Sequence, residues 1–253
     1  MRGRFPESMP PGKSHSRSER AGSRLSCRRQ WGLEHTIIGN PDRGNVSFTL
    51  AAGESVIVEA GSMSFMTAGM TVKPRLIGGL LTAVKRKLLG GESLFLSEYS
   101  TATAGAIAIS PAFPGTVLCK ELRGAGDSLL LAAGSFLASG PGVTLSTEYG
   151  GGRSWFSGTG PFILRATGSG PVFFNTYGAV IERDVQGALT VDTGHLVAWE
   201  PTLDYRIRGM GSVKKTLFSG EGLVMAFTGS GRIFLQTRQL GGFVRWLAPF
   251  CQG

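Results

Sequence analysis

The chain contains few of the side chains on which metal centres and disulfide frameworks are built. It has only three cysteines and three histidines among 253 residues. Cys27, Cys119 and Cys251 are far apart and show no C-x-x-C spacing, which argues against both a disulfide framework and a zinc site. Outside the N-terminal segment the histidines are His35 and His195, and neither has a second histidine nearby. We therefore expect no cofactor and no metal site, and a reducing compartment suits these thiols.

Long apolar runs are also missing. No run approaches the roughly 18 residues that a transmembrane helix needs. The N-terminus lacks the apolar stretch of a secretory signal. These two absences predict an intracellular protein that does not span a bilayer, and we expect it to be cytoplasmic.

The usual catalytic motifs are absent as well. Gly158–Gly160 and Gly168–Gly170 resemble pieces of a phosphate loop, but each lies between predicted strands and neither opens a helix. No G-x-x-x-x-G-K-[ST] motif occurs, and Ser157 lacks the preceding glycine of a nucleophile elbow. Glu182 and Asp184 share one face of a predicted strand, as solvated acids routinely do. We predict that the protein is not an enzyme.

The formal net charge of +9 is concentrated at the N-terminus. Residues 1–32 hold eight Lys or Arg and two Glu, a net charge of +6, which leaves +3 for the other 221 residues. The same segment is rich in Pro, Ser and Gly and has almost no apolar residues, so it is predicted to be a disordered basic extension. An Arg- and Ser-rich leader is also typical of a transit peptide, which would place the protein in mitochondria if its source is eukaryotic.

Glycine is abundant, with 39 residues that fall between short apolar runs. Glycines at such positions are typical of the turns of a many-stranded protein, because many turns require a positive φ. The segments GESVIVEAGS, from Gly53, and GDSLLLAAGS, from Gly126, are nearly the same ten residues. A third related strand, in GHLVAWEPTLDYRI, starts from Gly194. This similarity indicates an internal repeat.

Each repeat is expected to be one strand followed by a hairpin. The predicted hairpin tips are Gly105, Gly168–Gly170 and Gly229–Gly231. A unit of strands and turns cannot cover its own apolar face, so the three copies should share one core around a pseudo-threefold axis. The sequence thus predicts a single all-β domain of three tandem β-sandwich-like repeats, followed by a short C-terminal segment. The domain covers about residues 33–250 and its repeats about residues 33–115, 116–187 and 188–240.

The first repeat is longer because it contains the insert LIGGLLTAVKRKLLGG, residues 76–91. On a helical wheel most of its apolar residues fall on one face, so we expect it either to pack on the protein or to contact a membrane or a partner. For the second case the predicted contact residues are Leu80, Leu81, Lys85, Arg86, Lys87 and Leu88. The C-terminal LGGFVRWLAPFCQG is too short to span a bilayer and is predicted to dock on the sheet.

Five segments, taken in order, resemble the altered inheritance of mitochondria protein 24 family. They are AGSMSFMTAGM, KRKLLGGESLFLSEY, GTGPFILRATGSG, VDTGHLVAWEPTLDYRI and GEGLVMAFTGSGRIFLQTR. The resemblance implies three repeats with a fold like that of the tryptophan RNA-binding attenuation protein, arranged as a pseudo-trimer. It supplies no catalytic residues, and the ligands of that fold's namesake do not transfer. For function it implies only a link to mitochondrial inner-membrane organisation in the fungal member.

We therefore expect a non-enzymatic scaffold or binding module, peripheral to a membrane and involved in membrane or mitochondrial organisation. Its expected partners are an anionic membrane surface or a protein, and it is expected to be a homo-oligomer. Two alternatives stay open. In the first, nucleic-acid phosphates contact Lys214–Lys215 and the run Lys85–Lys87. Its bases stack on Phe173, Phe174 and Tyr177, although aromatic residues in strands are more often core. In the second, a small ligand or metal occupies a pocket on the pseudo-threefold axis.

Overall fold

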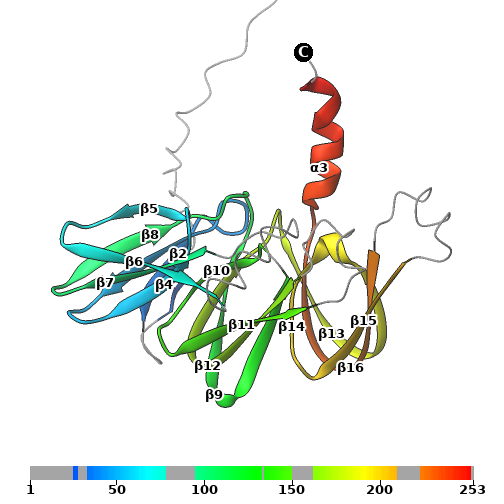
Figure 1. The fold of residues 1–253 in the computed structure, drawn as a ribbon. Helices are drawn as coiled ribbons and strands as arrows, with labels where there is room; N and C mark the ends of the chain where they lie inside the picture. Colours follow the sequence, from blue (N-terminus) through cyan, green and yellow to red (C-terminus); the bar gives the residue numbers. More distant parts are fainter. Residues whose placement is uncertain are drawn as a thin grey trace, which may run out of the picture.

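The structure is a computed structural model that describes residues 25–27, 33–77, 95–132, 134–149, 162–209 and 223–251. Within these residues almost all regular structure is β-strand, and the strands pair in two large antiparallel sheets (Figure 1). The described part also contains the α-helix α3 (Leu240–Leu247) and the short 3-10 helices η2 (Thr193–His195) and η3 (Ala248–Phe250). The all-β prediction is confirmed.

The smaller sheet has five strands and is formed by the N-terminal part of the chain. Its order is β1 (Leu25–Cys27), β2 (Glu34–Ile38), β3 (Asn45–Leu50), β8 (Gly105–Ile109) and β5 (Met63–Met66). Val46, Phe48 and Leu50 of β3 are fully buried, because the two-residue period of a strand sends them to the same face. β1 pairs with β2, so the predicted disorder of residues 1–32 does not hold at Leu25–Cys27.

The larger sheet has eleven strands. Nine of them follow the order β13 (Val180–Asp192), β16 (Leu223–Gln236), β14 (Leu196–Trp199), β9 (Val117–Ala132), β12 (Phe162–Asn175), β10 (Phe136–Ser139), β4 (Ser55–Glu59), β7 (Phe95–Thr101) and β6 (Met70–Leu76). The other two, β11 (Val143–Tyr149) and β15 (Leu203–Gly209), pair with β12 and β16. Along the chain the strands fall into three groups that lie side by side in Figure 1: β2–β8, β9–β12 and β13–β16.

The glycines predicted to form hairpin tips do not form them. Gly168 and Gly170 lie inside β12 and Gly229 lies inside β16, all three with positive φ. β12 pairs with β9 along its whole length, with one register shift next to Gly168, so the expected two arms are one long kinked strand. Gly105 begins β8, which lies in a different sheet from β7. The hairpin prediction is wrong because a kink inside a strand uses the same positive φ of glycine as a turn does.

One pairing pattern joins the three groups. β10 pairs with the second half of β12 and, on its other side, with β4 of the first group. β14 pairs with the second half of β16 and, on its other side, with β9 of the second group. β5 pairs with β8 in the same way, but no described strand pairs with its other side. No pairing of described strands joins the first group to the third, so the pseudo-threefold axis stays a prediction.

A second set of strands also shares one position. β4 pairs with β7, residues 128–132 of β9 pair with the first half of β12, and residues 188–192 of β13 pair with the first half of β16. The strand that the sequence places from Gly126 is therefore the second half of β9, which already begins at Val117. In the third group the matching strand precedes Gly194, which lies in η2. The predicted strand start at Gly126 is therefore wrong, because a glycine can lie inside a strand as well as at a turn. A strand does begin just after Gly194, but it is β14 (Leu196–Trp199), which shares the position of β10.

Aromatic side chains fill the core between the groups. Phe48 and Phe173 are fully buried and meet edge to face with ring centroids 5.0 Å apart. Phe174 of the same strand packs on Phe234 at 5.3 Å, and Trp199 anchors the third group. Phe173 and Phe174 are therefore core residues. The sequence analysis favoured this role over base stacking.

Candidate interaction surfaces

The two described histidines have structural roles. His35 is buried, its Nδ1 donates to the Leu33 carbonyl oxygen at 3.0 Å, and its ring meets Phe173 edge to face at 4.7 Å. His195 lies immediately before β14, as predicted, and its Nδ1 donates to the Gln236 carbonyl oxygen at 2.7 Å. Among the described residues no three of His, Cys, Asp and Glu gather as metal ligands would.

Glu182 and Asp184 lie on the exposed face of β13, where both contact one arginine. Arg232 Nε donates to Asp184 Oδ1 at 2.8 Å, and Arg232 Nη1 lies 3.5 Å from Glu182 Oε2. The hydrogen bond and the charge of Arg232 lower the pKa of Asp184. The same arginine's backbone N–H donates to Glu200, which also contacts Lys120. These are exposed ion pairs, which stabilise little, and not a pair of carboxyls tuned for acid and base catalysis.

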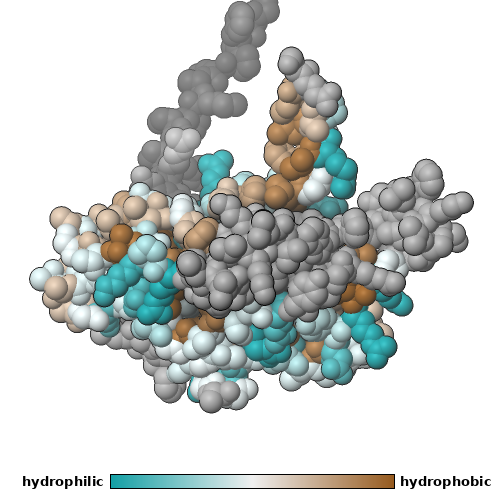
Figure 2. Space-filling model, in the orientation of Figure 1, coloured by the Kyte–Doolittle hydropathy of each residue, from teal (hydrophilic) through white to brown (hydrophobic). Residues whose placement is uncertain are grey.

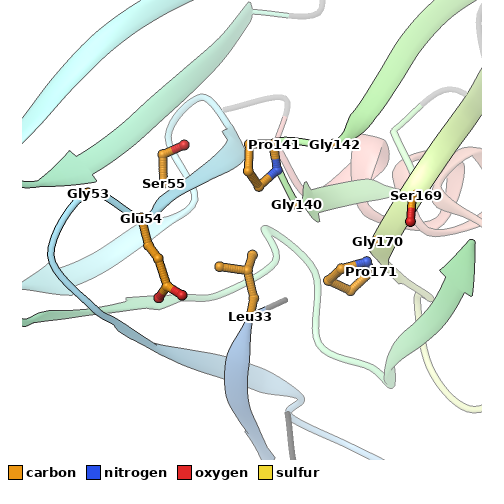
Figure 3. Close-up of a pocket in the computed structure, with 10 residues that line it drawn as sticks. All are labelled: Leu33, Gly53, Glu54, Ser55, Gly140, Pro141, Gly142, Ser169, Gly170 and Pro171. Carbon is orange, nitrogen blue, oxygen red and sulfur yellow. The ribbon is translucent and has the colours of Figure 1, made fainter. Parts of the chain in front are cut away.

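A hollow of about 430 Å³ opens between the first and second groups (Figure 3). Its lining is Leu33, Gly53–Ser55, Gly140–Gly142 and Ser169–Pro171. Its one charged side chain is Glu54, whose Oε2 already accepts the Ala51 N–H at 2.7 Å. The remaining lining is mostly glycine and proline, which offers little to recognise a ligand. The hollow therefore gives the small-ligand alternative no specific support.

Glu121 carries a buried carboxyl oxygen, Oε2, that has no hydrogen-bond donor among the described residues. Burial raises the pKa of Glu121, so its ionised form destabilises the fold at neutral pH. This cost disappears as the pH falls from the raised folded-state pKa to below the ordinary carboxyl pKa.

We expect Glu121→Gln to raise the free energy of unfolding at pH 7 by about 0.5 kcal/mol, because it removes a poorly paired, half-buried carboxylate whose charge water partly screens. At pH 3 the difference from wild type should vanish, since Glu121 of the wild type is then protonated in both the folded and the unfolded state. Urea unfolding at the two pH values measures this. The exposed Glu182→Gln is the matched control, and a loss of stability in Glu121→Gln at pH 7 would show that the carboxylate is favourably paired.

The residues predicted to touch a membrane or partner, Leu80, Leu81, Lys85, Arg86, Lys87 and Leu88, lie outside the described residues. Lys214–Lys215, considered for nucleic acid, lies outside them too. Of the insert, the structure describes its first two residues: Leu76 ends β6, and Ile77 is buried in a hydrophobic cluster with Leu129 and Phe174.

The C-terminal helix α3 stands away from the sheets and buries none of its residues (Figures 1 and 2). At 100° per residue its apolar side chains fall within an arc of about 160°, and Arg245 lies opposite. Figure 2 shows this division as a brown and a teal side. The prediction that this segment docks on the sheet is wrong, because an amphipathic pattern predicts an apolar helix face without saying what covers it. None of the described helices has the length and apolar character needed to cross a membrane.

A series of neighbouring aromatic rings begins in the loops between the strands and continues along α3. The ring centroids of Phe113 and Tyr177 lie 5.4 Å apart, and those of Tyr177 and Phe243 lie 6.2 Å apart. The series continues through Trp246 to Phe250. The exposed fraction rises along the helix from 41% at Phe243 to 63% at Trp246 and 73% at Phe250. The part of the helix farthest from the body is therefore the most available for contact.

A second exposed apolar surface lies in the first strand group, whereas α3 follows the third group. It is β5, whose four residues are all exposed. Phe65 is 57% exposed, and Met63 and Met66 lie close to 40%. Neither surface was predicted from the sequence. A signal existed for β5, since "MSFM" follows Ala-Gly-Ser just as the buried "FLAS" of β10 does.

Comparison with known proteins gives consistent matches. Residues 35–238 match the family described as Mitochondrial biogenesis AIM24. An uncharacterized protein of Streptococcus pyogenes serotype M6 is 30% identical over 214 residues, which are 81% of this chain and 86% of that protein. A Streptococcus pyogenes protein with an X-ray crystal structure is similar at a TM-score of 0.74 and 29% identity, covering 86% of this chain and 99% of the other.

Proposed function

Because the chain belongs to the Mitochondrial biogenesis AIM24 family, we propose that it is a non-enzymatic scaffold that binds anionic membrane surfaces peripherally. The family description connects such proteins to an organelle bounded by membranes but gives no reaction. The scarcity of catalytic side chains in the sequence supports a binding role.

The observation that carries the proposal is the exposed apolar face of α3. Residues 240–250 make about 16 Å of helix, much shorter than the roughly 30 Å hydrocarbon core, so such a helix lies in the membrane interface. Residues 237–253, which include α3, contain two arginines, Arg238 and Arg245, and no Asp or Glu, which suits an anionic surface. The insert with Lys85, Arg86 and Lys87 would add headgroup contacts, each worth about 1 kcal/mol near such a surface.

We also propose that the three strand groups are three copies of one repeat. The support is the pairing pattern: β4, the end of β9 and the end of β13 share one position. β5, β10 and β14 share a second position, each pairing with the strand or half-strand that follows a glycine kink or turn. A scaffold of repeats presents side chains at fixed spacing without needing a catalytic pocket.

Flotation of the full chain with vesicles tests the membrane proposal. We expect binding to phosphatidylcholine vesicles that contain phosphatidylglycerol, and much weaker binding to phosphatidylcholine alone. The double variant Trp246→Glu, Phe250→Glu should reduce binding at least tenfold, since two aromatic side chains can no longer be buried in the interface. Lys85→Glu, Arg86→Glu, Lys87→Glu should weaken the preference for the anionic lipid.

Val72→Glu is the matched control, because Val72 is a 49% exposed apolar residue on the β-body. Its binding should equal that of wild type. If wild type does not float with either kind of vesicle, the membrane role is refuted. Retention of DNA or RNA with a steep salt dependence would instead favour the nucleic-acid alternative.

A further inference from the structure

The series of strand groups ends in two unpaired edges. At one end β5 pairs only with β8, and at the other β13 pairs only with β16, among the described strands. Figure 1 shows β5 in the first group at the left and β13 in the third group at the right. An unprotected edge strand offers backbone N–H and C=O groups to another strand, and proteins usually block it with Lys, Pro or a covering segment. β5, with the sequence MSFM, has neither Lys nor Pro.

β5 differs from its counterparts in burial. All four residues of β10 are buried, and so are all four residues of β14. Each of these strands lies between a partner in its own group and a partner in the preceding group. All four residues of β5 are exposed, and among the described strands no group precedes that of β5. The exposed apolar side chains of β5 are thus those that a preceding group would cover.

The other edge shows the complementary difference. Ile57 of β4 and Leu130 of β9 are 4% and 1% exposed, and each lies opposite a residue of the short strand of the next group, Ser139 or Trp199. Thr190 occupies the corresponding stretch of β13, with which no strand of a following described group pairs, and it is exposed. The third group therefore carries an acceptor edge to which nothing in the described chain is paired.

We propose that β5 of one chain pairs antiparallel with residues 188–192 of β13 in a second copy of this chain. The inference rests on the three-repeat architecture of the proposed function. Its template is the pair of junctions within the chain, where Ala138 lies opposite Val58 and Ala198 lies opposite Leu131. At the junction between copies, Phe65 takes the place of these alanines.

Such an interface is head to tail. Each copy offers a different surface to each neighbour, so assembly continues beyond a dimer and closes into a ring or grows as an open series. A twofold dimer through β5 alone would instead leave the β13 edge free. The two arrangements give different behaviour when variants are mixed.

Sedimentation velocity of the full chain and of two edge variants tests the proposal. The first variant is Phe65→Glu, Met66→Glu in β5, and the second is Ala188→Glu, Thr190→Glu in β13; all four side chains are exposed, so both variants should fold as judged by circular dichroism. Wild type should sediment as assemblies larger than one chain. Each variant alone should sediment as a monomer, with a shift of more than tenfold in the concentration needed for association.

Mixing the two variants should restore one functional junction and yield a species of two chains and no larger. A wild-type monomer at high concentration, or a β13 variant that still assembles, would overturn the proposal. A mixture that stays monomeric would overturn it as well. The edge variants retain α3 and should still float with anionic vesicles, so failure of assembly is distinguishable from failure of the membrane proposal.

Discussion

Replacing Trp199 by alanine should cost about 3–5 kcal/mol of unfolding free energy, the range for removing a large aromatic side chain from a core. Trp199 is fully buried in β14 and meets Tyr205 and Phe227 edge to face at 5.4 and 5.8 Å. Its backbone lies opposite Leu130 of β9 and Ile233 of β16, so the cavity would open where the second and third groups join.

For a chain of this size the loss corresponds to a melting temperature roughly 6–20 °C lower. Urea unfolding followed by far-UV circular dichroism measures it. Trp199→Phe is the control, because it keeps an aromatic ring and removes the indole Nε1–H, which has no described acceptor. It should lose much less than Trp199→Ala. Equal losses in both variants would show that the indole ring as a whole, and not aromatic packing, stabilises this junction.

Replacing Gly168 by alanine should destabilise the protein by about 2–5 kcal/mol, from two sources. Gly168 has a φ of 114°, a conformation that costs a residue with a Cβ about 1–2 kcal/mol. An added Cβ would also overlap the backbone carbonyl oxygen of Gly142, which can move only with the β11 end of the sheet. Forcing extra atoms into such a packed position adds about 1–3 kcal/mol.

Gly187→Ala separates the two sources. Gly187 has a φ of 99°, but an added Cβ would meet nothing within 4 Å. It should lose only the backbone term of about 1–2 kcal/mol. Thermal unfolding of both variants measures the difference. If Gly168→Ala were no worse than Gly187→Ala, the kink in β12 would be able to open away from Gly142.

The sequence was sufficient for the class of fold and for the family. Short apolar runs separated by glycine predicted an all-β protein, and the described chain has one α-helix of eight residues. The core placement of Phe173 and Phe174 was also predictable, because aromatic residues in apolar strands are usually buried. The similarity of GESVIVEAGS and GDSLLLAAGS located two segments that occupy one position in the pairing, β4 and the end of β9.

The candidate surfaces were beyond local sequence patterns. MSFM, FLAS and LVAW look alike as apolar strands, yet only the first is exposed, because burial depends on which group follows which in space. Likewise the C-terminal pattern predicted an amphipathic segment but not that α3 would leave the sheets.

Local chemistry therefore determined which residues form strands and where glycine allows the chain to turn or kink, because these depend on neighbours in the sequence. The tertiary structure decided whether a given glycine ends a strand or bends it, as at Gly168, since that depends on whether a partner strand continues alongside. It also decided which apolar faces stay uncovered, because each buried short strand is covered by a group more than 60 residues away in sequence. β5 and α3 are exposed because no described group of strands covers them.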